Sequence, residues 1–333
     1  MAPAPPDGAR RSDLLALAAA LGPMARVDVP LGRLTTYRVG GSAAVFCEPR
    51  DEGELEVVRR ALAGRHLPVL VLGKGSNLLV ADAGFPGLVV QLTGSFADIA
   101  LPPPDDRPGE RVVRAGGAVG LPVLARRTVE VGLLGLEWAV GVPGSVGGAV
   151  RMNAGGHGSD TAAALRRYRW LDLASEAGGE DDPHRLHLGY RTSDLKETEV
   201  VVWAELAVRS GRAEDGRAAL AEIVRWRRQH QPGGSNAGSV FTNPPDDAAG
   251  RLVEVSGCKG LRVGTAAVST KHANFIQADD GGSADDVRRL IDRVRREVAE
   301  RTGVELRTEV RLVGFAGTEN GAMGPADEDL EDG

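Results

Sequence analysis

Cysteine is scarce in this chain of 333 residues, which contains only Cys47 and Cys258. The two lie far apart and form no Cys-x-x-Cys pair, so the sequence offers neither a disulfide scaffold nor a thiolate zinc site. His184 and His187 form an isolated His-x-x-His pair without a nearby third ligand, so we expect surface residues there rather than a metal site. The sequence therefore predicts no metal, and its low cysteine content fits a reducing compartment.

Long apolar runs are also missing. The longest one near the start, from Leu14 to Leu21, is too short to cross a membrane. Arg10 and Arg11 precede it, as in a twin-arginine export signal, but Asp13 follows directly and no clear Ala-x-Ala cleavage site is present. An amphipathic helix capped by Ser12, after a disordered N-terminus of residues 1–11, explains the stretch better. We expect a cytoplasmic protein that does not associate with membranes.

Aromatic residues make up only 4% of the chain, which gives no support to a base-stacking surface for nucleic acid. The net charge of −6 is local, because residues 315–333 contain six acidic residues and no basic ones. The rest of the chain is therefore neutral, which argues against a nucleic-acid binder. We expect residues 315–333 to form a disordered, solvated acidic tail.

Glycine, by contrast, is abundant, with 45 of 333 residues, about twice the usual share of roughly 7%. Four loops rich in Gly, Ser and Asn each follow an expected strand, at residues 36–41, 73–77, 141–148 and 153–156. Side chains this small expose backbone N–H groups, which can form a concave site for an anion such as a pyrophosphate. One such loop is usually only a turn, but four of them indicate a large phosphate-bearing ligand.

Common nucleotide and nucleophile motifs do not fit these loops. The loop from Gly73 to Asn77 follows a strand, but Leu78 stands where a dinucleotide fingerprint needs a third small residue. Lys74 does not have the spacing of a Walker A loop. No Gly-x-Ser-x-Gly elbow occurs either.

Short apolar strands alternate with helices, which favours the α+β class. We expect strands at 43–47, 68–72, 88–92, 111–114 and 198–208, and helices at 51–62, 121–131 and 214–228. A breaker-rich stretch at 101–110 is expected to be a seam between two lobes. In the last module we expect strands at 263–268, 274–278 and 304–313, and a helix that Ser283 caps and Gly303 ends.

Five motifs occur in the order and spacing of one enzyme family. They are Gly73 to Asn77, Pro143 to Gly148 with Asn153-Ala154-Gly155, Tyr190-Arg191-Thr192-Ser193, Asn236 to Phe241, and Thr308-Glu309-Val310-Arg311. Each is weak alone, but together they make the chain resemble the UDP-N-acetylenolpyruvoylglucosamine reductases (UDP-N-acetylmuramate dehydrogenases) of bacterial peptidoglycan synthesis. The resemblance runs from about Thr35 to Gly314, and residues 269–274 resemble the second, shorter type of this enzyme.

The resemblance implies a fold and a reaction. An FAD-binding domain of the vanillyl-alcohol-oxidase type, in two lobes, would cover residues 12–210, and an α+β substrate-binding domain would cover 211–314. FAD would be bound non-covalently, since no His or Cys lies in the early glycine loops. NADPH would be the co-substrate, and UDP-N-acetylglucosamine enolpyruvate would be reduced to UDP-N-acetylmuramate. No obligate protein partner is expected.

Three residues match the family's catalytic positions. Hydride from flavin N5 would add to the vinyl carbon, and Arg191 would hold the substrate carboxylate toward which negative charge builds. Ser239 would give the proton to the resulting carbanion, a role that a hydroxyl can fill only where water is excluded. Glu309 matches a carboxyl beside the substrate carboxylate, so we expect it to be protonated, or bridged through water, during the hydride step.

Further residues are carried over to ligand binding. Those implied to bind FAD are Tyr37, Arg38, Gly40, Gly41, Gly73, Lys74, Gly75, Ser76, Asn77, Pro143, Gly144, Gly147, Gly148, Asn153, Ala154, Gly155 and Arg227. Those implied to contact the substrate are Tyr190, His230, Asn243 and Lys271. Many relatives have Lys where this chain has His230, so substrate binding should weaken as the histidine loses its proton with rising pH. Gly156-His157 also departs from a common Ala-Tyr pair that flanks the flavin.

Two other functions stay open. Another FAD-dependent oxidoreductase of the same superfamily, such as an oxygen-using alcohol oxidase, would share the FAD loops but would not need Arg191, Ser239 and Glu309 together. A non-catalytic nucleotide-sugar binding module would be colourless and would leave the glycine loops of the first lobe without a ligand.

Overall fold

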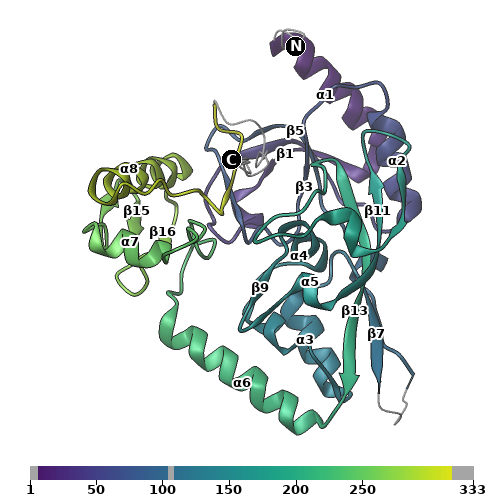
Figure 1. The fold of residues 1–333 in the computed structure, drawn as a ribbon. Coiled ribbons are helices and arrows are strands. Elements are labelled where there is room, and N and C mark those ends of the chain that lie inside the picture. Colours follow the sequence, from purple (N-terminus) through teal and green to yellow (C-terminus); the bar gives the residue numbers. More distant parts are fainter. Residues whose placement is uncertain (1–6, 104–108, 317–333) are drawn as a thin grey trace, which may run out of the picture.

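The computed structural model describes residues 7–103 and 109–316, which form two lobes and a C-terminal domain (Figure 1). The predicted acidic tail lies outside the described residues from position 317 onward, and so does the middle of the expected seam at 101–110. Helices and strands both contribute to the cores of the described parts, which confirms the expected α+β class.

The first lobe is a four-stranded sheet with helices packed beside it. Its elements are α1 (Asp7–Leu21), β1 (Ala25–Pro30), β2 (Ser42–Cys47), α2 (Glu52–Leu62), β3 (Val69–Val71), β4 (Leu78–Val80) and β5 (Phe85–Val90). The sheet order is β1-β2-β5-β3, in which β2, β5 and β3 run parallel and β1 is antiparallel. β3 ends at Val71, and the loop of residues 73–77 begins after Leu72. The sheet therefore positions this loop at the centre of the molecule.

One expectation for this lobe is wrong. The helix α1 begins at Asp7, so residues 7–11, expected to be disordered, form its first turns, and Ser12 lies inside it rather than at its N-cap. Leu14, Leu17 and Leu21 bury one face of α1 against the lobe. A helix that tertiary packing holds at one end can extend beyond its packed residues, because each added residue gains a hydrogen bond.

The second lobe is built on an antiparallel sheet. Its elements are β6 (Ile99–Ala100), β7 (Glu110–Gly116), α3 (Leu121–Glu130), β8 (Leu133–Leu134), α4 (Val146–Met152), β9 (Gly155–Gly156), β10 (Ser159–Asp160), α5 (Thr161–Ala164), β11 (Leu165–Asp172), β12 (Gly178–Asp181) and β13 (Glu199–Ser210). The sheet order is β12-β11-β13-β7-β6. The helix α6 (Ala213–His230) then packs Leu220, Ile223 and Val224 against the core of this lobe. It leads across to the C-terminal domain (Figure 1).

The C-terminal domain packs two helices on a small antiparallel sheet. Its elements are α7 (Ala249–Val255), β14 (Arg262–Val263), β15 (Ala266–Val268), β16 (Ile276–Ala278), α8 (Ala284–Thr302) and β17 (Arg311–Val313). Ser283 caps α8 by accepting a hydrogen bond from the N–H of Asp286, and Gly303 ends the helix at a φ of 74°. The predicted limits of this helix are therefore confirmed, and its buried face includes Val287, Leu290, Ile291, Val294 and Val298.

Two strands of the C-terminal domain differ from expectation. Residues 263–268 form a hairpin rather than one strand, because Gly264 turns the chain at a φ of 51° and the Thr265 N–H donates to Asp286. Of residues 304–313, only β17 is a strand, and its partner is β4 of the first lobe, in parallel.

Three contacts fasten this domain to the first lobe. Besides the β17–β4 pair, Tyr37 and Val39 lie in the core of the C-terminal domain. The carboxylate of Asp82 accepts the N–H of Ala284 at 2.9 Å, at the start of α8. The C-terminal domain is thus attached to the first lobe by strand pairing, by core packing and by a hydrogen bond at the start of α8.

Candidate active site

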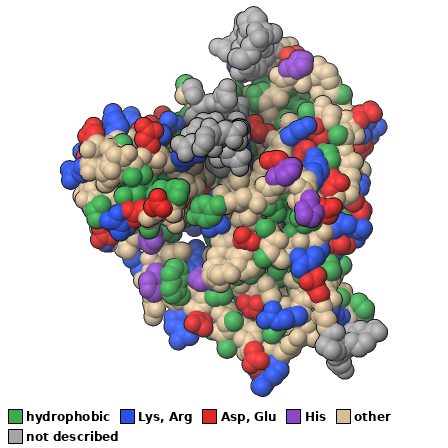
Figure 2. All heavy atoms as spheres, in the orientation of Figure 1, with side chains coloured by type: hydrophobic (Ala, Val, Ile, Leu, Met, Phe, Trp, Pro, Cys, Tyr) green, Lys and Arg blue, Asp and Glu red, His purple; other side chains and the backbone are tan. Residues whose placement is uncertain are grey.

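One cavity lies where the two lobes and the C-terminal domain meet, with a volume of about 270 Å³. Its walls come from the 73–77 loop, the segment from Gly141 through α4, Arg191, the end of α6, the 236–239 loop, and the residues from Glu309 to Arg311. Figure 2 shows a recess between the C-terminal domain and the main body, and on this face basic and acidic side chains are interspersed.

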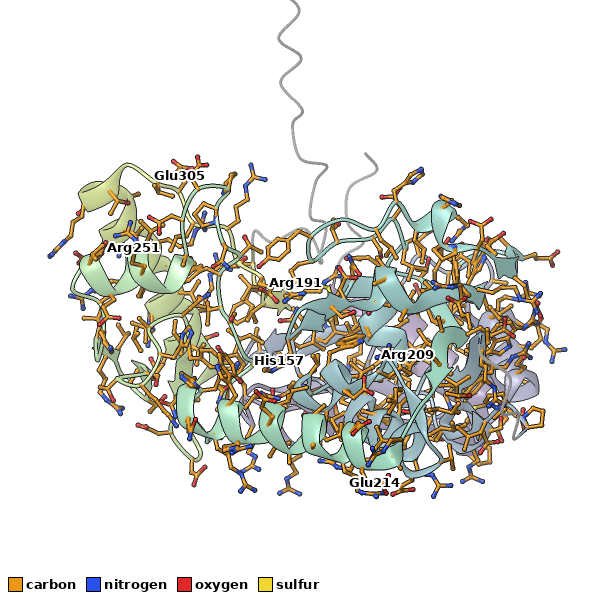
Figure 3. The ribbon with its side chains drawn as sticks, turned by 60° about the horizontal axis from the view of Figure 1, so that its bottom comes forward. His157, Arg191, Arg209, Glu214, Arg251 and Glu305 are labelled. Carbon is orange, nitrogen blue, oxygen red and sulfur yellow. The ribbon has the colours of Figure 1, made fainter. Side chains whose placement is uncertain are left out.

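The three predicted catalytic residues all line this cavity, although they come from three distant parts of the chain. Figure 3 shows Arg191 in the middle of the molecule, between the C-terminal domain, which carries Arg251 and Glu305, and the main body. The Arg191 Nε donates to Glu309 Oε1 at 3.1 Å. The fold therefore brings a guanidinium, a carboxyl group and a serine hydroxyl to one cavity.

Arg191 combines an uncommon backbone conformation with a guanidinium that is held by protein acceptors. Its backbone has a φ of 59°, an uncommon conformation for a residue with a side chain. Its Nη2 donates to the Gly155 carbonyl at 3.0 Å and its Nη1 to the Asn153 carbonyl at 3.4 Å. Of the five N–H donors of a guanidinium, these bonds and the one to Glu309 occupy three. One N–H on each Nη atom remains for an anion in the cavity.

Glu309 is positioned through its backbone. Its N–H donates to the Val240 carbonyl at 2.8 Å, and its own carbonyl accepts from Asn77 Nδ2 at 3.0 Å. Burial raises the pKa of the Glu309 carboxyl, although Arg191 acts in the opposite direction. A carboxyl group in this setting takes up a proton more readily than an exposed glutamate does.

Ser239 ends a tight loop. Asn236 shapes this loop, since its Oδ1 accepts the Gly238 N–H at 3.0 Å and its Nδ2 donates to the carbonyls of Gly233 and Gly234. Gly238 adopts a φ of 79°. Among the described residues the Ser239 hydroxyl has no hydrogen-bond partner, so it is available to a ligand in the cavity.

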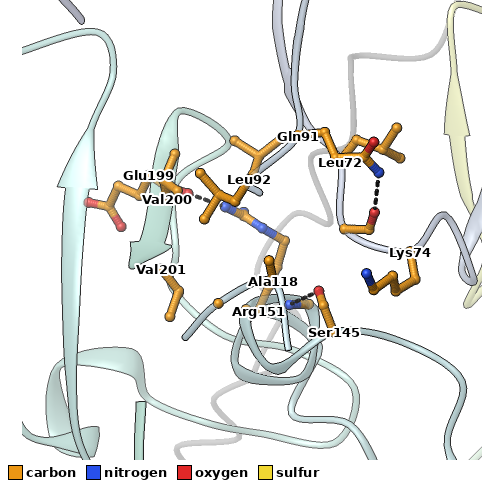
Figure 4. Close-up of a pocket in the computed structure, with 15 residues that line it drawn as sticks. Leu72, Lys74, Gln91, Leu92, Ala118, Ser145, Arg151, Glu199, Val200 and Val201 are labelled. Carbon is orange, nitrogen blue, oxygen red and sulfur yellow. Dashed lines mark hydrogen bonds between the residues drawn. The ribbon is translucent and has the colours of Figure 1, made fainter. Parts of the chain in front are cut away.

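The 73–77 loop presents its backbone to the cavity. Within the described chain, none of its five N–H groups, from Gly73 to Asn77, is paired with a protein acceptor. A small pocket of about 70 Å³ continues from it, with Lys74 and Ser145 on one side and Arg151 and Glu199 on the other (Figure 4). Consecutive N–H groups beside the Lys74 ammonium favour an anion, so this end of the cavity suits phosphate.

The residues implied to bind FAD divide into two groups. Those that line the cavity or the adjoining pocket are Gly73, Lys74, Gly75, Ser76, Asn77, Pro143, Gly144, Gly147, Gly148, Ala154, Gly155 and Arg227. Arg227 donates to the Gly141 carbonyl, and burial lowers its pKa. It forms no ion pair with a carboxylate of residues 7–103 or 109–316.

The other five residues implied to bind FAD do not line these pockets. They are Tyr37, Arg38, Gly40, Gly41 and Asn153. Tyr37 is fully buried in the C-terminal core, and burial raises the pKa of its hydroxyl. The side chain of Asn153 is used within the protein, because Nδ2 donates to the Gly189 carbonyl at 2.9 Å and Oδ1 accepts the Ala162 N–H at 2.9 Å.

None of the four residues implied to contact the substrate lines the cavity in this structure. Tyr190 is 58% exposed beside Arg191. His230 stacks on Trp226 with ring centroids 4.6 Å apart. Asn243 accepts the Ala249 N–H at the start of α7, and Lys271 donates to the Arg228 carbonyl. Their contact with substrate, including the expected pH dependence at His230, stays a prediction.

Six of the residues that line the cavity were assigned no individual role from the sequence, although three of them lie in the loops and motifs named there. They are Thr36, Arg151, Met152, Gln231, Asn236 and Arg311. Arg311 could have been found, because it follows Glu309 by two residues and alternate residues of an extended segment share a face. Arg151 gave no such signal, since its partners are backbone carbonyls 44 to 48 positions away.

The described ranges, 7–103 and 109–316, also bear on metal binding and on membrane association. No group of three or more His, Cys, Asp or Glu residues is placed there to hold a metal ion. His187 instead lies against Asp194, with 2.7 Å between Nδ1 and Oδ2. Within the same ranges, no helix has the length and apolar character needed to span a membrane.

Comparison with known families and proteins covers nearly all of the described chain. Residues 43–179 match an FAD binding domain, and residues 229–313 match the C-terminal domain of UDP-N-acetylenolpyruvoylglucosamine reductase. The chain is 43% identical over 298 residues to the UDP-N-acetylenolpyruvoylglucosamine reductase of Rubrobacter xylanophilus, covering 88% of this chain and 97% of that one. It is 44% identical to a second such reductase, from Symbiobacterium thermophilum, over 86% of this chain and 91% of that one.

A solved structure is similar as well. The crystal structure of UDP-N-acetylenolpyruvylglucosamine reductase from Thermus caldophilus superposes with a TM-score of 0.73 at 36% identity. The match covers 87% of this chain and 99% of that one. Sequence and fold thus agree over the two lobes and the C-terminal domain.

Proposed function

The chain belongs to the UDP-N-acetylenolpyruvoylglucosamine reductase family, as its five motifs predicted, and from this premise we propose that it reduces UDP-N-acetylglucosamine enolpyruvate with NADPH and FAD. The product is UDP-N-acetylmuramate. The observation that carries the proposal is the meeting of Arg191, Ser239 and Glu309 in the cavity that the glycine loops line. A cytoplasmic location is part of this proposal, and the scarcity of cysteine supports it.

The residues present fit FAD. The match of residues 43–179 to an FAD binding domain includes the 73–77 loop, whose unpaired N–H groups would hold the diphosphate together with Lys74. The half-buried guanidinium of Arg227 would lie against the ring system. When bound, FAD supplies a two-electron carrier that accepts hydride from NADPH and passes it on.

Arg191 would bind the substrate carboxylate through the two N–H donors that remain on its Nη atoms. This geometry supports a paired hydrogen bond that becomes stronger as negative charge develops on the carboxylate. Glu309 would then stand beside a second carboxylate. Its raised pKa supports uptake of a proton at that moment, which removes the repulsion between the two groups.

Ser239 would deliver the proton. Its hydroxyl has no acceptor among the described residues, so it can point at the carbon that becomes basic when hydride adds to the neighbouring vinyl carbon. The oxygen then regains a proton from solvent before the next turnover. The cavity walls would exclude bulk water during the transfer, without which a serine hydroxyl is too weak an acid.

A visible spectrum of the anaerobic, FAD-loaded protein tests the reaction class. NADPH should bleach the flavin bands, and the enolpyruvyl sugar nucleotide should restore them. Bleaching without recovery would show that the acceptor is a different compound. A protein that binds no FAD would contradict the proposal from the start.

The Ser239→Ala variant tests the proton donor. Bleaching by NADPH should stay within about twofold of the parent rate, whereas recovery with the substrate should slow by about 10²–10⁴-fold, the usual worth of a positioned proton donor. Both rates are measured by stopped-flow absorbance. Ser95→Ala, which removes an exposed hydroxyl bonded to the Arg50 carbonyl, is the matched control and should change neither rate. Normal recovery in Ser239→Ala would mean that another group gives the proton.

A further inference from the structure

The segment that carries Arg191 has almost no regular structure of its own. Between η5 (Pro183–Leu186) and β13, residues 189–198 form only turns and one isolated bridge, between Gly189 and Thr192. Arg191 itself has a strained backbone, with a φ of 59°. The position of its guanidinium therefore depends on contacts made with other parts of the chain.

Most of these contacts go to one short stretch, residues 151–155, at the end of α4 and just after it. The Asn153 amide donates to the Gly189 carbonyl at 2.9 Å, and the Arg191 guanidinium donates to the carbonyls of Asn153 and Gly155. The Ser193 hydroxyl donates to the Arg151 carbonyl at 2.7 Å.

The side chain of Arg151 binds the C-terminal part of the same segment. Its Nη1 donates to the Leu195 carbonyl at 3.1 Å, and its Nη2 donates to the carbonyls of Lys196 at 3.0 Å and Glu199 at 2.6 Å. Figure 4 shows the guanidinium extending from its helix toward Glu199. One side chain thus bonds to three carbonyls at the start of β13, and of these the Lys196 carbonyl also accepts the Glu199 N–H at 3.0 Å.

The guanidinium of Arg151 binds backbone carbonyls and no carboxylate of the described residues. It forms no salt bridge with any carboxylate in the described parts of the chain, and burial lowers its pKa to about 10, helped by Arg311 nearby. Arg151 also lines both the cavity and the pocket beside the 73–77 loop. It therefore stands between the region suited to phosphate and the segment that presents Arg191.

We propose that Arg151 is a positioning residue for the reaction: its forked hydrogen bonds fix the 189–199 segment and so set the place of Arg191 in the cavity. This inference rests on the proposed function. A guanidinium that must meet a carboxylate with two hydrogen bonds tolerates little displacement, and an error of about 1 Å costs up to about 10²-fold in rate. Arg151 acts on the substrate step through Arg191, and not on the binding of FAD or the step with NADPH.

Two substitutions of Arg151 distinguish the effect of its forked guanidinium from the effect of its positive charge. Arg151→Met removes both the fork and the charge, whereas Arg151→Lys keeps the charge but cannot reach three carbonyls. In both FAD-loaded variants, bleaching by NADPH should stay within about threefold of the parent rate, while recovery with the enolpyruvyl substrate should slow by about 10–100-fold. Arg126→Met, which removes an exposed arginine bonded to the Pro122 carbonyl, is the control and should change neither rate.

Hydrogen–deuterium exchange gives a readout that does not depend on activity. Amides of residues 189–199 should exchange faster in both Arg151 variants than in the parent, with no change over α3. If the parent protein fails to react with the substrate, the proposed function is wrong, and the exchange data still decide whether Arg151 holds the segment. Unchanged exchange in this segment overturns the inference.

Other outcomes are equally clear. Normal recovery in Arg151→Lys would show that only the charge matters, which contradicts a positioning role. An equal loss in both half-reactions would show a general structural defect and would also contradict it. If the Arg151 variants fail to fold, Ser193→Ala removes the bond from Ser193 to the Arg151 carbonyl, together with the 3.4 Å bond that the Ser193 hydroxyl accepts from the Leu195 N–H. This variant should slow recovery by about 3–10-fold and leave bleaching unchanged, and parent-like recovery would overturn the inference.

Discussion

The loops at residues 36–41 and 73–77 each contain two glycines, yet their backbone N–H groups are used in opposite ways. In the 36–41 loop, the N–H groups of Thr36, Arg38 and Gly41 all donate to protein carbonyls. Its side chains at Tyr37 and Val39 fill the core of the C-terminal domain. In the 73–77 loop no N–H group has an acceptor among the described residues, and all five of its residues line the cavity.

The difference shows what glycine does in each place. At Gly40 and Gly41 the missing side chain lets two backbone segments touch, since a Cβ atom would overlap the carbonyl oxygens of Val80 and Asp82. In the 73–77 loop Gly75 is packed in the same way, since a Cβ atom there would overlap the Leu34 carbonyl oxygen, but the N–H groups of the loop are left open to a ligand. The loops are also joined, because the Thr36 N–H donates to the Gly75 carbonyl at 3.0 Å. The packed loop thus supports the open one, and a glycine-rich motif alone does not identify a ligand contact.

The largest effect is expected for Gly40→Ala. Its φ of 109° strains any side chain, and the new methyl group would meet the Val80 backbone, which cannot move without disturbing β4. We expect a loss of about 3 kcal/mol or more in the free energy of unfolding, measured by urea denaturation. Gly64→Ala has a similar positive φ, of 74°, but open space around it, so it should cost only about 1 kcal/mol. Equal losses for the two variants would remove the distinction between packed and open glycines.

A smaller effect is expected for Lys74→Met, in the open loop. Lys74 lines the cavity and pairs with no carboxylate in the described ranges, so its charge is free to meet the diphosphate. Fluorescence titration of the FAD-free protein should show about tenfold weaker FAD binding, or ~1.4 kcal/mol, and the difference should shrink at high salt. The unfolding free energy of the FAD-free protein should stay within about 0.5 kcal/mol. Lys259→Met, which breaks a surface pair with Glu254, is the control and should leave FAD affinity unchanged.

The smallest effect is expected for Tyr37→Phe. The buried hydroxyl has no hydrogen-bond partner among the described residues, and the ring lies in the C-terminal core away from the cavity. Removing it should leave FAD affinity unchanged and should raise the unfolding free energy by about 0–1 kcal/mol, because an unpaired buried hydroxyl is costly. A clear loss of FAD affinity would instead support the role that the family resemblance implies for Tyr37.

Much of the fold could be predicted where local rules dominate. The helix α8 is the best example, because the Ser283 cap, the apolar spacing from Val287 to Val298 and the turn at Gly303 all lie within its own residues. The strand predicted at 304–313 failed for the opposite reason. Only Arg311–Val313 forms a strand, and it pairs with β4, more than 230 positions earlier in the chain, while Thr308 makes no more than an isolated bridge to Phe241. No local pattern specifies a partner at that distance.

The residues of the site also divide into those that the sequence could identify and those that it could not. Arg191, Ser239 and Glu309 could be named because each lies in a motif that is recognisable in order along the chain, and the structure brings all three to one cavity. Arg151 could not, because it bonds to the backbone carbonyls of Leu195, Lys196 and Glu199, and a carbonyl is the same whatever side chain its residue carries.

Composition and motif order were enough to establish the family, the α+β class and the residue types that the reaction needs. These properties depend on short-range patterns, such as caps, apolar spacing and glycine at turns, which a chain carries in its own residues. The tertiary structure was needed to decide which glycine loop leaves its N–H groups unpaired, which tyrosine lies in the C-terminal core, and which arginine bonds to the carbonyls of Leu195, Lys196 and Glu199. Such contacts depend on pairing between distant backbone groups, and backbone pairing leaves no trace in side-chain identity.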